Sequence, residues 1–283
     1  MKSYIKRFYM QRKKSPSSNP VVHFFENLLV NCVDLYRFRY WYKIFAGLQL
    51  INKFKVKGLG TDSRTWLILP YLSKLGIRKR YGSQCFQAMF VTELVHVDVT
   101  DGVFLDVGAN DPVHINNTWY LERLGWTGLA FEPIPRLAQK WPDSGRKTPC
   151  LPICLGREKS TARFLEYERD FMSGMADKVC QSGGEVLRGS YDVPVRRLED
   201  VLEEHDITHV HYMSLDVEGS ELDVLAGVNF DKVTFDLISI ENEGNFWQKW
   251  PIRKFMLNAG FYYCARLWHD DVFVSREIFE RLQ

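Results

Sequence analysis

The sequence has few cysteines, and they are not spaced as metal ligands or as a disulfide framework. Six of the 283 residues are cysteine, and no two of them form a Cys-x-x-Cys pair. Cys150 and Cys154 are separated by three residues, with no further Cys or His beside them. Zinc sites need sets of closely spaced ligands, and disulfide scaffolds need denser cysteine. We therefore expect free thiols and a cytoplasmic protein.

A long apolar run is also missing near the start of the sequence. Residues 1–20 are basic, and the stretch that follows is interrupted by Glu26, Asn27, Asn31 and Asp34. A membrane-spanning helix needs about 20 consecutive apolar residues, and a secretory signal needs an apolar segment after its basic start. We expect neither.

The net charge of +2 is small but unevenly distributed, since residues 1–60 hold twelve Lys or Arg against two acids. Residues 21–52 have helical periodicity, and residues 36–43 alternate Arg with aromatics. We predict a basic tail and helical region over residues 1–85 and a catalytic domain over residues 86–283. The helices could pack on that domain, or on a second copy of the chain in a homo-oligomer. Alternatively, residues 1–60 could make a peripheral contact with the inner face of a membrane.

Residues 103–111 combine an apolar run, one acid and a tight turn. The run predicts a buried parallel strand, and Gly108 predicts the turn that ends it. Asp106 interrupts the apolar residues near the carboxyl end of this strand. Ligands of open α/β sheets bind beyond the carboxyl ends of the strands, so Asp106 is placed for a ligand.

A second predicted strand, residues 128–132, ends in Glu132 and is followed by Pro133. An acid at this distance beyond a glycine turn accepts hydrogen bonds from the ribose hydroxyls of a bound nucleotide. The turn holds one glycine where pyrophosphate-binding turns have three, which argues against NAD and FAD. S-adenosylmethionine, which has no phosphate and carries a cationic sulfur, suits such a site.

Strands and helices alternate from residue 101 onward, as in a doubly wound parallel sheet. The predicted later strands are residues 148–155, 161–166, 209–217 and 235–241, and residues 261–267 and 271–275 predict a terminal hairpin. Helices are expected at residues 116–124, 198–205, 220–225 and 251–259.

A second group of acids follows the strand at residues 209–217. Asp216 and Glu218 flank its end, and Glu241 and Asn242 end the next strand. The carboxyl ends of neighbouring parallel strands meet at one edge, so these oxygens could bind Mg²⁺ or another divalent cation through Asp216, Glu241 and Asn242. Alternatively, one carboxylate is a general base for a hydroxyl group. Helix capping and solvation are the purely structural reading.

The histidines divide by position. His209 and His211 share one strand face, but they stand at the start of their strand, remote from the expected site. His114, just after the first turn, is better placed for substrate binding or base catalysis.

Residues 106–110, 131–133 and 214–221 together resemble the FkbM family of S-adenosylmethionine-dependent methyltransferases. The resemblance implies a Rossmann-like class I methyltransferase fold with a mostly parallel seven-stranded sheet and an antiparallel terminal hairpin. It also implies that residues 106–110, including Asp106, Gly108, Ala109 and Asn110, bind the methionine end of the cofactor. Glu132 would hold its ribose, and Asp216 and Glu218 would line the reaction cleft.

Two functions remain open from the sequence. The first is O-methyl transfer to a hydroxyl of a sugar, glycan or glycosylated natural product, with a small-molecule or glycan acceptor. The alternative is a cofactor-binding scaffold that docks to a membrane or a partner through its N-terminal region. Nucleic acid is not an expected partner, because residues 61–283 are net acidic and disfavour a groove that follows phosphates.

Overall fold

The computed structural model describes residues 81–283 except residues 85, 179–184, 244–245, 268 and 283. The predicted basic tail, the helical region over residues 21–52 and the membrane contact through residues 1–60 lie outside the described residues. The division of the chain at residue 85 stays a prediction.

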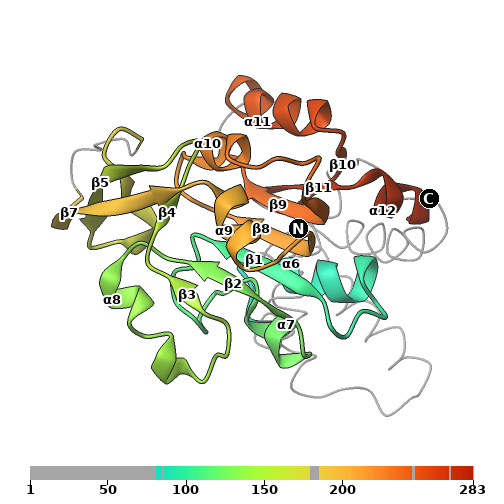
Figure 1. Cartoon of the computed structure of the whole chain (residues 1–283), viewed down its shortest axis with the longest axis horizontal. Helices are drawn as coiled ribbons and strands as arrows, with labels where there is room; N and C mark the ends of the chain where they lie inside the picture. Colours follow the sequence, from blue (N-terminus) through green and yellow to red (C-terminus); the bar gives the residue numbers. More distant parts are fainter. Residues whose placement is uncertain (1–80, 85, 179–184, 244–245, 268, 283) are drawn as a thin grey trace, which may run out of the picture. The chain divides into compact units, whose positions relative to one another are not determined.

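A seven-stranded sheet is the centre of the described part (Figure 1). Its order is β10-β11-β9-β8-β1-β2-β3. All the other strands run in one direction, and β11 runs in the opposite direction between β10 and β9. This confirms the expected mostly parallel sheet with an antiparallel terminal hairpin. The strands are β1 (Val103–Val107), β2 (Thr127–Phe131), β3 (Cys150–Leu151), β8 (His209–Leu215), β9 (Thr234–Glu241), β10 (Tyr262–Leu267) and β11 (Asp270–Val274).

The central strands form here because their residues are apolar on both faces. Leu105 of β1, Met213 of β8 and Ile238 of β9 are all fully buried in one core. That core also takes in residues of α9 (Leu198–Glu204), α10 (Glu221–Ala226) and α11 (Phe246–Asn258). A strand covered on both faces needs a continuous apolar run, which is the pattern of the sequence.

A second sheet, which the sequence did not predict, has the order β4-β7-β5-β6. Its strands are β4 (Cys154–Leu155), β5 (Ser160–Tyr167), β6 (Gly174–Met175) and β7 (Leu187–Arg196). The single strand expected at residues 148–155 was wrong, since β3 and β4 belong to different sheets. Pro152 lies between them and has no amide hydrogen, so a continuous ladder of hydrogen bonds cannot form there.

The remaining α-helices are all short. They are α6 (Gln87–Phe90), which continues into a π-helical turn over Val91–Val95, α7 (Trp119–Arg123), α8 (Pro135–Ala138) and α12 (Arg276–Arg281). Helix α11 begins at Phe246, before the predicted start at residue 251, and so includes Pro251 in its interior. Among the described residues, no helix combines the length and the apolar content needed to cross a bilayer.

Candidate active site

A cavity of about 1090 Å³ lies against the carboxyl ends of β1, β2, β8 and β9. Asp106 pairs with Ala130 and with Ser214, and Ser214 pairs with Ser239, so these four strand ends are in register at one edge. Residues of the second sheet, including Phe164 and Met175, line the cavity as well. Sites for small ligands usually occupy about 300–1000 Å³, so there is room for a cofactor and part of an acceptor.

The turn after β1 needs glycine at position 108. Gly108 has φ of +81°, and a Cβ atom there would lie 1.7 Å from the main-chain oxygen of Asp216. The amides of Gly108 and Ala109 donate to the carbonyl oxygen of Phe131, at 3.1 and 3.0 Å. The turn is therefore held between β2 and the end of β8, and its backbone borders the cavity.

Glu132 is buried at the end of β2 and lines the cavity. Its Oε2 accepts from the amide of Asn110 at 2.7 Å, and its Oε1 accepts from the amide of Ile134 at 2.8 Å. Burial raises the pKa of Glu132 to about 7, although these two donors lower it. Each carboxylate oxygen keeps a second lone pair, so the group can still accept from the hydroxyls of a ligand. Pro133, next to it, also lines the cavity.

Asp106 faces the cavity and also fixes the segment before α7. Its Oδ2 accepts from Thr118 Oγ1 at 2.7 Å and from Asn116 Nδ2 at 2.9 Å. Burial raises the pKa of Asp106, and the bond from Thr118 is the main opposing influence. Asn116 in turn accepts from the amide of Trp119 at 2.8 Å. This holds the start of α7 against the end of β1.

Arg146 is a residue of this region that the sequence did not reveal. Its side chain is 3% exposed and forms an ion pair with Glu122 at 2.6 Å. It also donates to Asn116 Oδ1 at 3.0 Å and to Thr118 Oγ1 at 3.1 Å. Arg146 thus supports the two side chains that hold Asp106. No motif could have found it, because its contacts come from segments distant in the sequence.

Three carboxyl groups meet on the other side of the cavity. An oxygen atom from each of Asp216, Glu218 and Glu241 lies within 4.8 Å of the other two. Burial raises the pKa of all three, and their mutual repulsion raises the pKa of Asp216 and Glu218 further. The pKa of Glu218 rises to about 8 and that of Glu241 to about 7. Asp216 Oδ1 is buried and has no hydrogen-bond partner among the described residues.

Of the three predicted metal ligands, Asp216 and Glu241 are neighbours, and Asn242 lines the same cavity. The side-chain Nδ2 of Asn242 donates to Asp271 Oδ2 at 2.8 Å and to the carbonyl oxygen of Lys249 at 3.1 Å. Glu218 also belongs to the acid cluster. A divalent cation at this position stays a prediction.

His114 is exposed and lines the cavity from the loop after β1. Its amide donates to Asp111 Oδ1 at 2.9 Å, which fixes the loop but leaves the imidazole outside the buried part of the site. Its predicted catalytic role stays a prediction.

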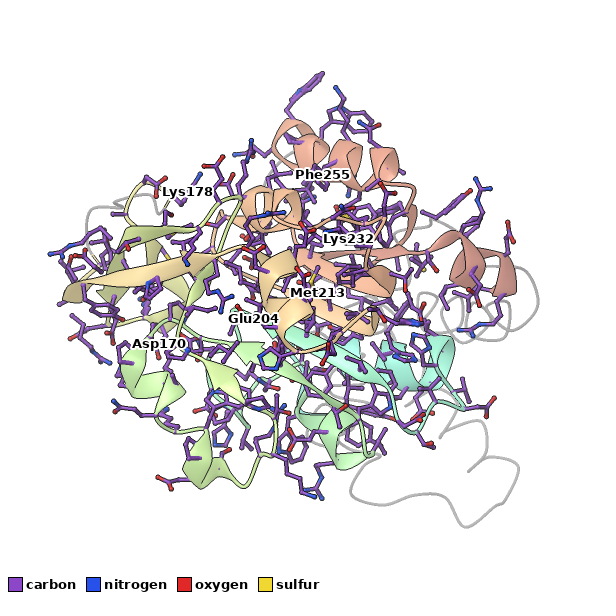
Figure 2. All side chains as sticks on the ribbon, in the orientation of Figure 1. Asp170, Lys178, Glu204, Met213, Lys232 and Phe255 are labelled. Carbon is purple, nitrogen blue, oxygen red and sulfur yellow. The ribbon has the colours of Figure 1, made fainter. Side chains whose placement is uncertain are left out.

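Ion pairs attach the second sheet to the rest of the site. Arg136 lies on α8, shortly after Glu132 in the sequence. It forms an ion pair with Glu166 of β5 at 2.7 Å and another with Asp170. Lys178 reaches Asp223 of α10 at 2.6 Å. Figure 2 labels Asp170 and Lys178 on this side of the molecule. The second sheet is thus fastened next to both the Glu132 and the Asp216 sides of the cavity.

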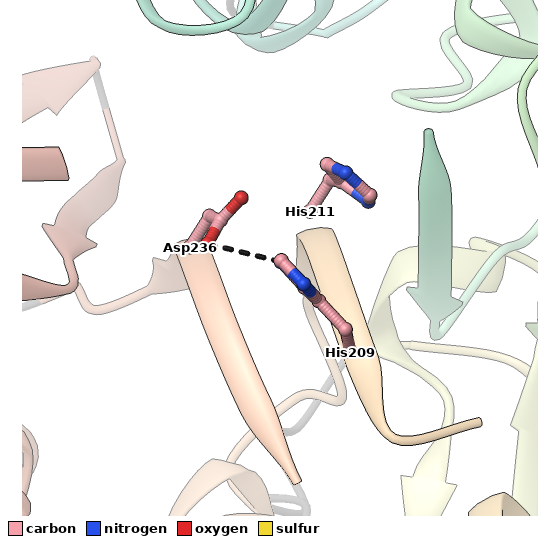
Figure 3. Close-up of side chains that lie close together, drawn as sticks. All are labelled: His209, His211 and Asp236. Atoms are coloured by element: carbon pink, nitrogen blue, oxygen red, sulfur yellow. Dashed lines mark ion pairs between the residues drawn. The ribbon is translucent and has the colours of Figure 1, made fainter. Parts of the chain in front are cut away.

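His209, His211 and Asp236 form a separate cluster at the amino ends of β8 and β9 (Figure 3). His209 Nε2 lies 3.0 Å from Asp236 Oδ1. The amide of Val103 donates to His211 Nδ1 at 3.0 Å, so neutral His211 carries its proton on Nε2. A metal at Nε2 would need that proton removed, which argues against ligation by His211. As expected, this cluster lies at the opposite end of the strands from the cavity.

Comparison of the sequence with known protein families identifies one family. A search of curated proteins finds no match for the chain. The sequence model of the methyltransferase FkbM domain matches residues 106–263, which is more than half of the chain. The match begins at Asp106, at the carboxyl end of β1, and includes Glu132, Asp216, Glu218 and Glu241. The chain therefore belongs to the FkbM methyltransferase family.

Proposed function

We propose that the protein transfers a methyl group from S-adenosylmethionine to a hydroxyl oxygen of a sugar, a glycan or a glycosylated natural product. The observation that carries the proposal is one cavity with two carboxylate sides. Glu132 stands at the end of β2, and the cluster of Asp216, Glu218 and Glu241 stands at the ends of β8 and β9. The first side suits a ribose, and the second suits a reacting hydroxyl.

The residues present fit this cofactor. The Gly108 turn has no set of three glycines for a pyrophosphate, and S-adenosylmethionine has no phosphate. Glu132 would hold the ribose hydroxyls, and the turn over residues 106–110 would border the methionine end. When bound, the cofactor supplies an activated methyl group on a positively charged sulfur. The raised pKa values of the three acids favour a cation nearby, because a positive charge stabilises their ionised forms.

A carboxylate of the cluster would take the proton of the acceptor hydroxyl. A general base works best when its pKa lies near the working pH, and burial raises the pKa of Glu241 to about 7. We assign Asp216 as the base because it lines the cavity and is hydrogen-bonded to Glu241, and because the cationic sulfur of a bound cofactor would favour its ionised form. Proton removal of this kind contributes roughly 10²–10⁴-fold, and positioning of the acceptor contributes the rest.

Two variants separate cofactor binding from catalysis. Glu132→Gln should weaken binding of S-adenosylhomocysteine at least about tenfold, because a hydrogen bond to a charged group is worth about 1.5–3 kcal/mol. Asp216→Asn should keep this affinity within about threefold and lower methyl transfer at least about 10²-fold. Calorimetry with S-adenosylhomocysteine, with NAD as a control ligand, measures the first, and transfer of labelled methyl to a panel of sugar acceptors measures the second.

Each outcome assigns the site. Binding of NAD alone would overturn the methyltransferase cofactor. Full turnover by Asp216→Asn would remove Asp216 as the base. If the folded wild type bound S-adenosylhomocysteine but methylated no acceptor, the scaffold function would take first place.

A chelator distinguishes a metal from a base at Asp216. A divalent cation held by Asp216 and Glu241 predicts loss of turnover in EDTA and its return with Mg²⁺. A carboxylate base predicts unchanged turnover in EDTA. Measuring cofactor affinity in the same samples shows whether any loss lies in binding or in transfer.

A further inference from the structure

Helix α11 presents apolar side chains on two opposite faces. Ile252 and Met256 are buried in the main core. On the outside, Trp247 is 78% exposed, Trp250 is 42% exposed and Leu257 is 47% exposed. The outer face of a surface helix is normally polar, because only the inner face is covered. An exposed apolar outer face is therefore typical of a surface that contacts another protein or a membrane.

The exposed residues form one stripe. Residues 247, 250, 254 and 257 follow each other at intervals of three, four and three, which places them on a single side of a helix. We call Trp247, Trp250, Lys254 and Leu257 the outer stripe of α11. Lys254, in the middle of the stripe, is exposed. Figure 1 shows α11 at the top of the view, with its outer side turned away from the sheet.

The charge of α11 identifies the kind of surface that fits it. The helix contains Lys249, Arg253 and Lys254 and no acid. Asp271 neutralises Arg253 through two bonds of 2.7 and 2.9 Å. Tryptophan combined with lysine is the composition of helices that lie in a membrane–water interface, where the ring is buried among headgroups and the ammonium meets lipid phosphate.

We propose that the outer stripe of α11 docks on an anionic lipid surface. The helix would lie in the plane of the interface, with the two tryptophans and Leu257 inserted and Lys254 at the phosphates. This placement concerns α11 and is independent of any membrane contact by residues 1–60.

The stripe lies beside the mouth of the cavity. Pro251, one helical turn after Trp247, lines the cavity, as do Gln248 and Ile252. A docked helix would therefore set the opening of the active site close to the lipid surface. Resting on the proposed function, this favours an acceptor whose sugar is carried by a lipid or held at the membrane.

Flotation of the full chain with vesicles tests the docking without any need for turnover. The wild type should float with phosphatidylcholine vesicles that contain phosphatidylglycerol, and less with phosphatidylcholine alone. The double variant Trp247→Ala/Trp250→Ala should lose about tenfold or more of its partitioning, and Lys254→Glu should lose binding to the anionic vesicles only. Val97→Ala is the matched control, because Val97 is 63% exposed in the loop before β1.

The variants keep residues 1–60, so a difference from the wild type reports α11 alone. The proposal is wrong if the wild type does not float, or if the double variant floats as the wild type does. In the second case, a raised KM of the double variant for a soluble sugar acceptor would mean that the stripe binds the acceptor itself. Calorimetry with S-adenosylhomocysteine on the same variants shows that their cofactor site is intact and separates this result from failure of the proposed function.

Discussion

At the scale of single residues, the site depends on contacts that allow almost no change in volume. Gly108 approaches the main chain of Asp216 so closely that a methyl group would overlap it. The same contact places the turn after β1 beside the segment that carries Asp216 and Glu218. One residue thus couples the stability of the fold to the geometry between the two sides of the cavity.

Gly108→Ala should destabilise the protein by at least about 3 kcal/mol. A positive φ costs an L-residue about 1–2 kcal/mol, and the clash with backbone atoms adds to that because the backbone cannot rotate away. Gly145→Ala is the control, since Gly145 has φ of +78° but no atom within 4 Å of the added methyl group. It should lose only the cost of the positive φ, about 1–2 kcal/mol. Urea unfolding measures both, and equal losses would show that the close approach is absent in solution.

At the scale of elements, the terminal hairpin is attached through a buried charge. Asp271 of β11 is fully buried and bonds Arg253 of α11 and Arg266 of β10, the latter at 2.6 Å. Asn242, at the end of β9, donates to the same carboxylate. The hairpin, α11 and the end of β9 therefore meet at one side chain, close to Glu241 in the active site.

Asp271→Asn should cost about 3–5 kcal/mol, because removal of one partner leaves two guanidinium groups without their buried counter-charge. Asp192→Asn is a matched control. Asp192 pairs with Arg163 at 3.1 Å, but both side chains are more than half exposed, so its loss should be below about 1 kcal/mol. Thermal unfolding of the two variants gives the comparison. Similar values would mean that solvent reaches Asp271 in the folded protein.

At the scale of the whole molecule, the acids of the active site oppose folding at neutral pH. Burial, followed by repulsion from Glu241, raises the pKa of Glu218 from 4.5 to about 8. The folded state therefore binds a proton more tightly than the unfolded chain. The stability that this proton contributes is fully present below about pH 4.5 and is lost as the pH rises toward 8.

Glu218→Gln should accordingly stabilise the protein by about 4 kcal/mol at pH 8 and by little at pH 4.5. Glutamine keeps the size of the side chain and cannot ionise. Glu158→Gln, at an exposed position, is the control for a lost surface charge. Urea unfolding at several pH values measures the difference. A gain that is independent of pH would show that the carboxyl group of Glu218 is not held in a raised-pKa environment.

The sequence by itself determined the central strands and the polar residues at their carboxyl ends. The strands predicted at residues 103–107 and 235–241 are β1 (Val103–Val107) and β9 (Thr234–Glu241), because buried parallel strands must be apolar throughout and end at glycine or polar residues. The grouping of Asp216 with Glu241 also followed, since the carboxyl ends of parallel strands lie at one edge. The family model matches residues 106–263, which include both strand ends.

Only the tertiary structure decided how the site is completed. The second sheet depends on pairing between β5 and β7. The support of Asp106 depends on Thr118, which is held in turn by Arg146 from a distant part of the sequence. Likewise, the side-chain Nδ2 of Asn242 donates to Asp271, and Glu218 lies with Asp216 and Glu241 in the acid cluster. Local patterns report which residues are buried and where strands end. They do not report which distant side chains satisfy a buried charge, because that choice is made by packing between elements.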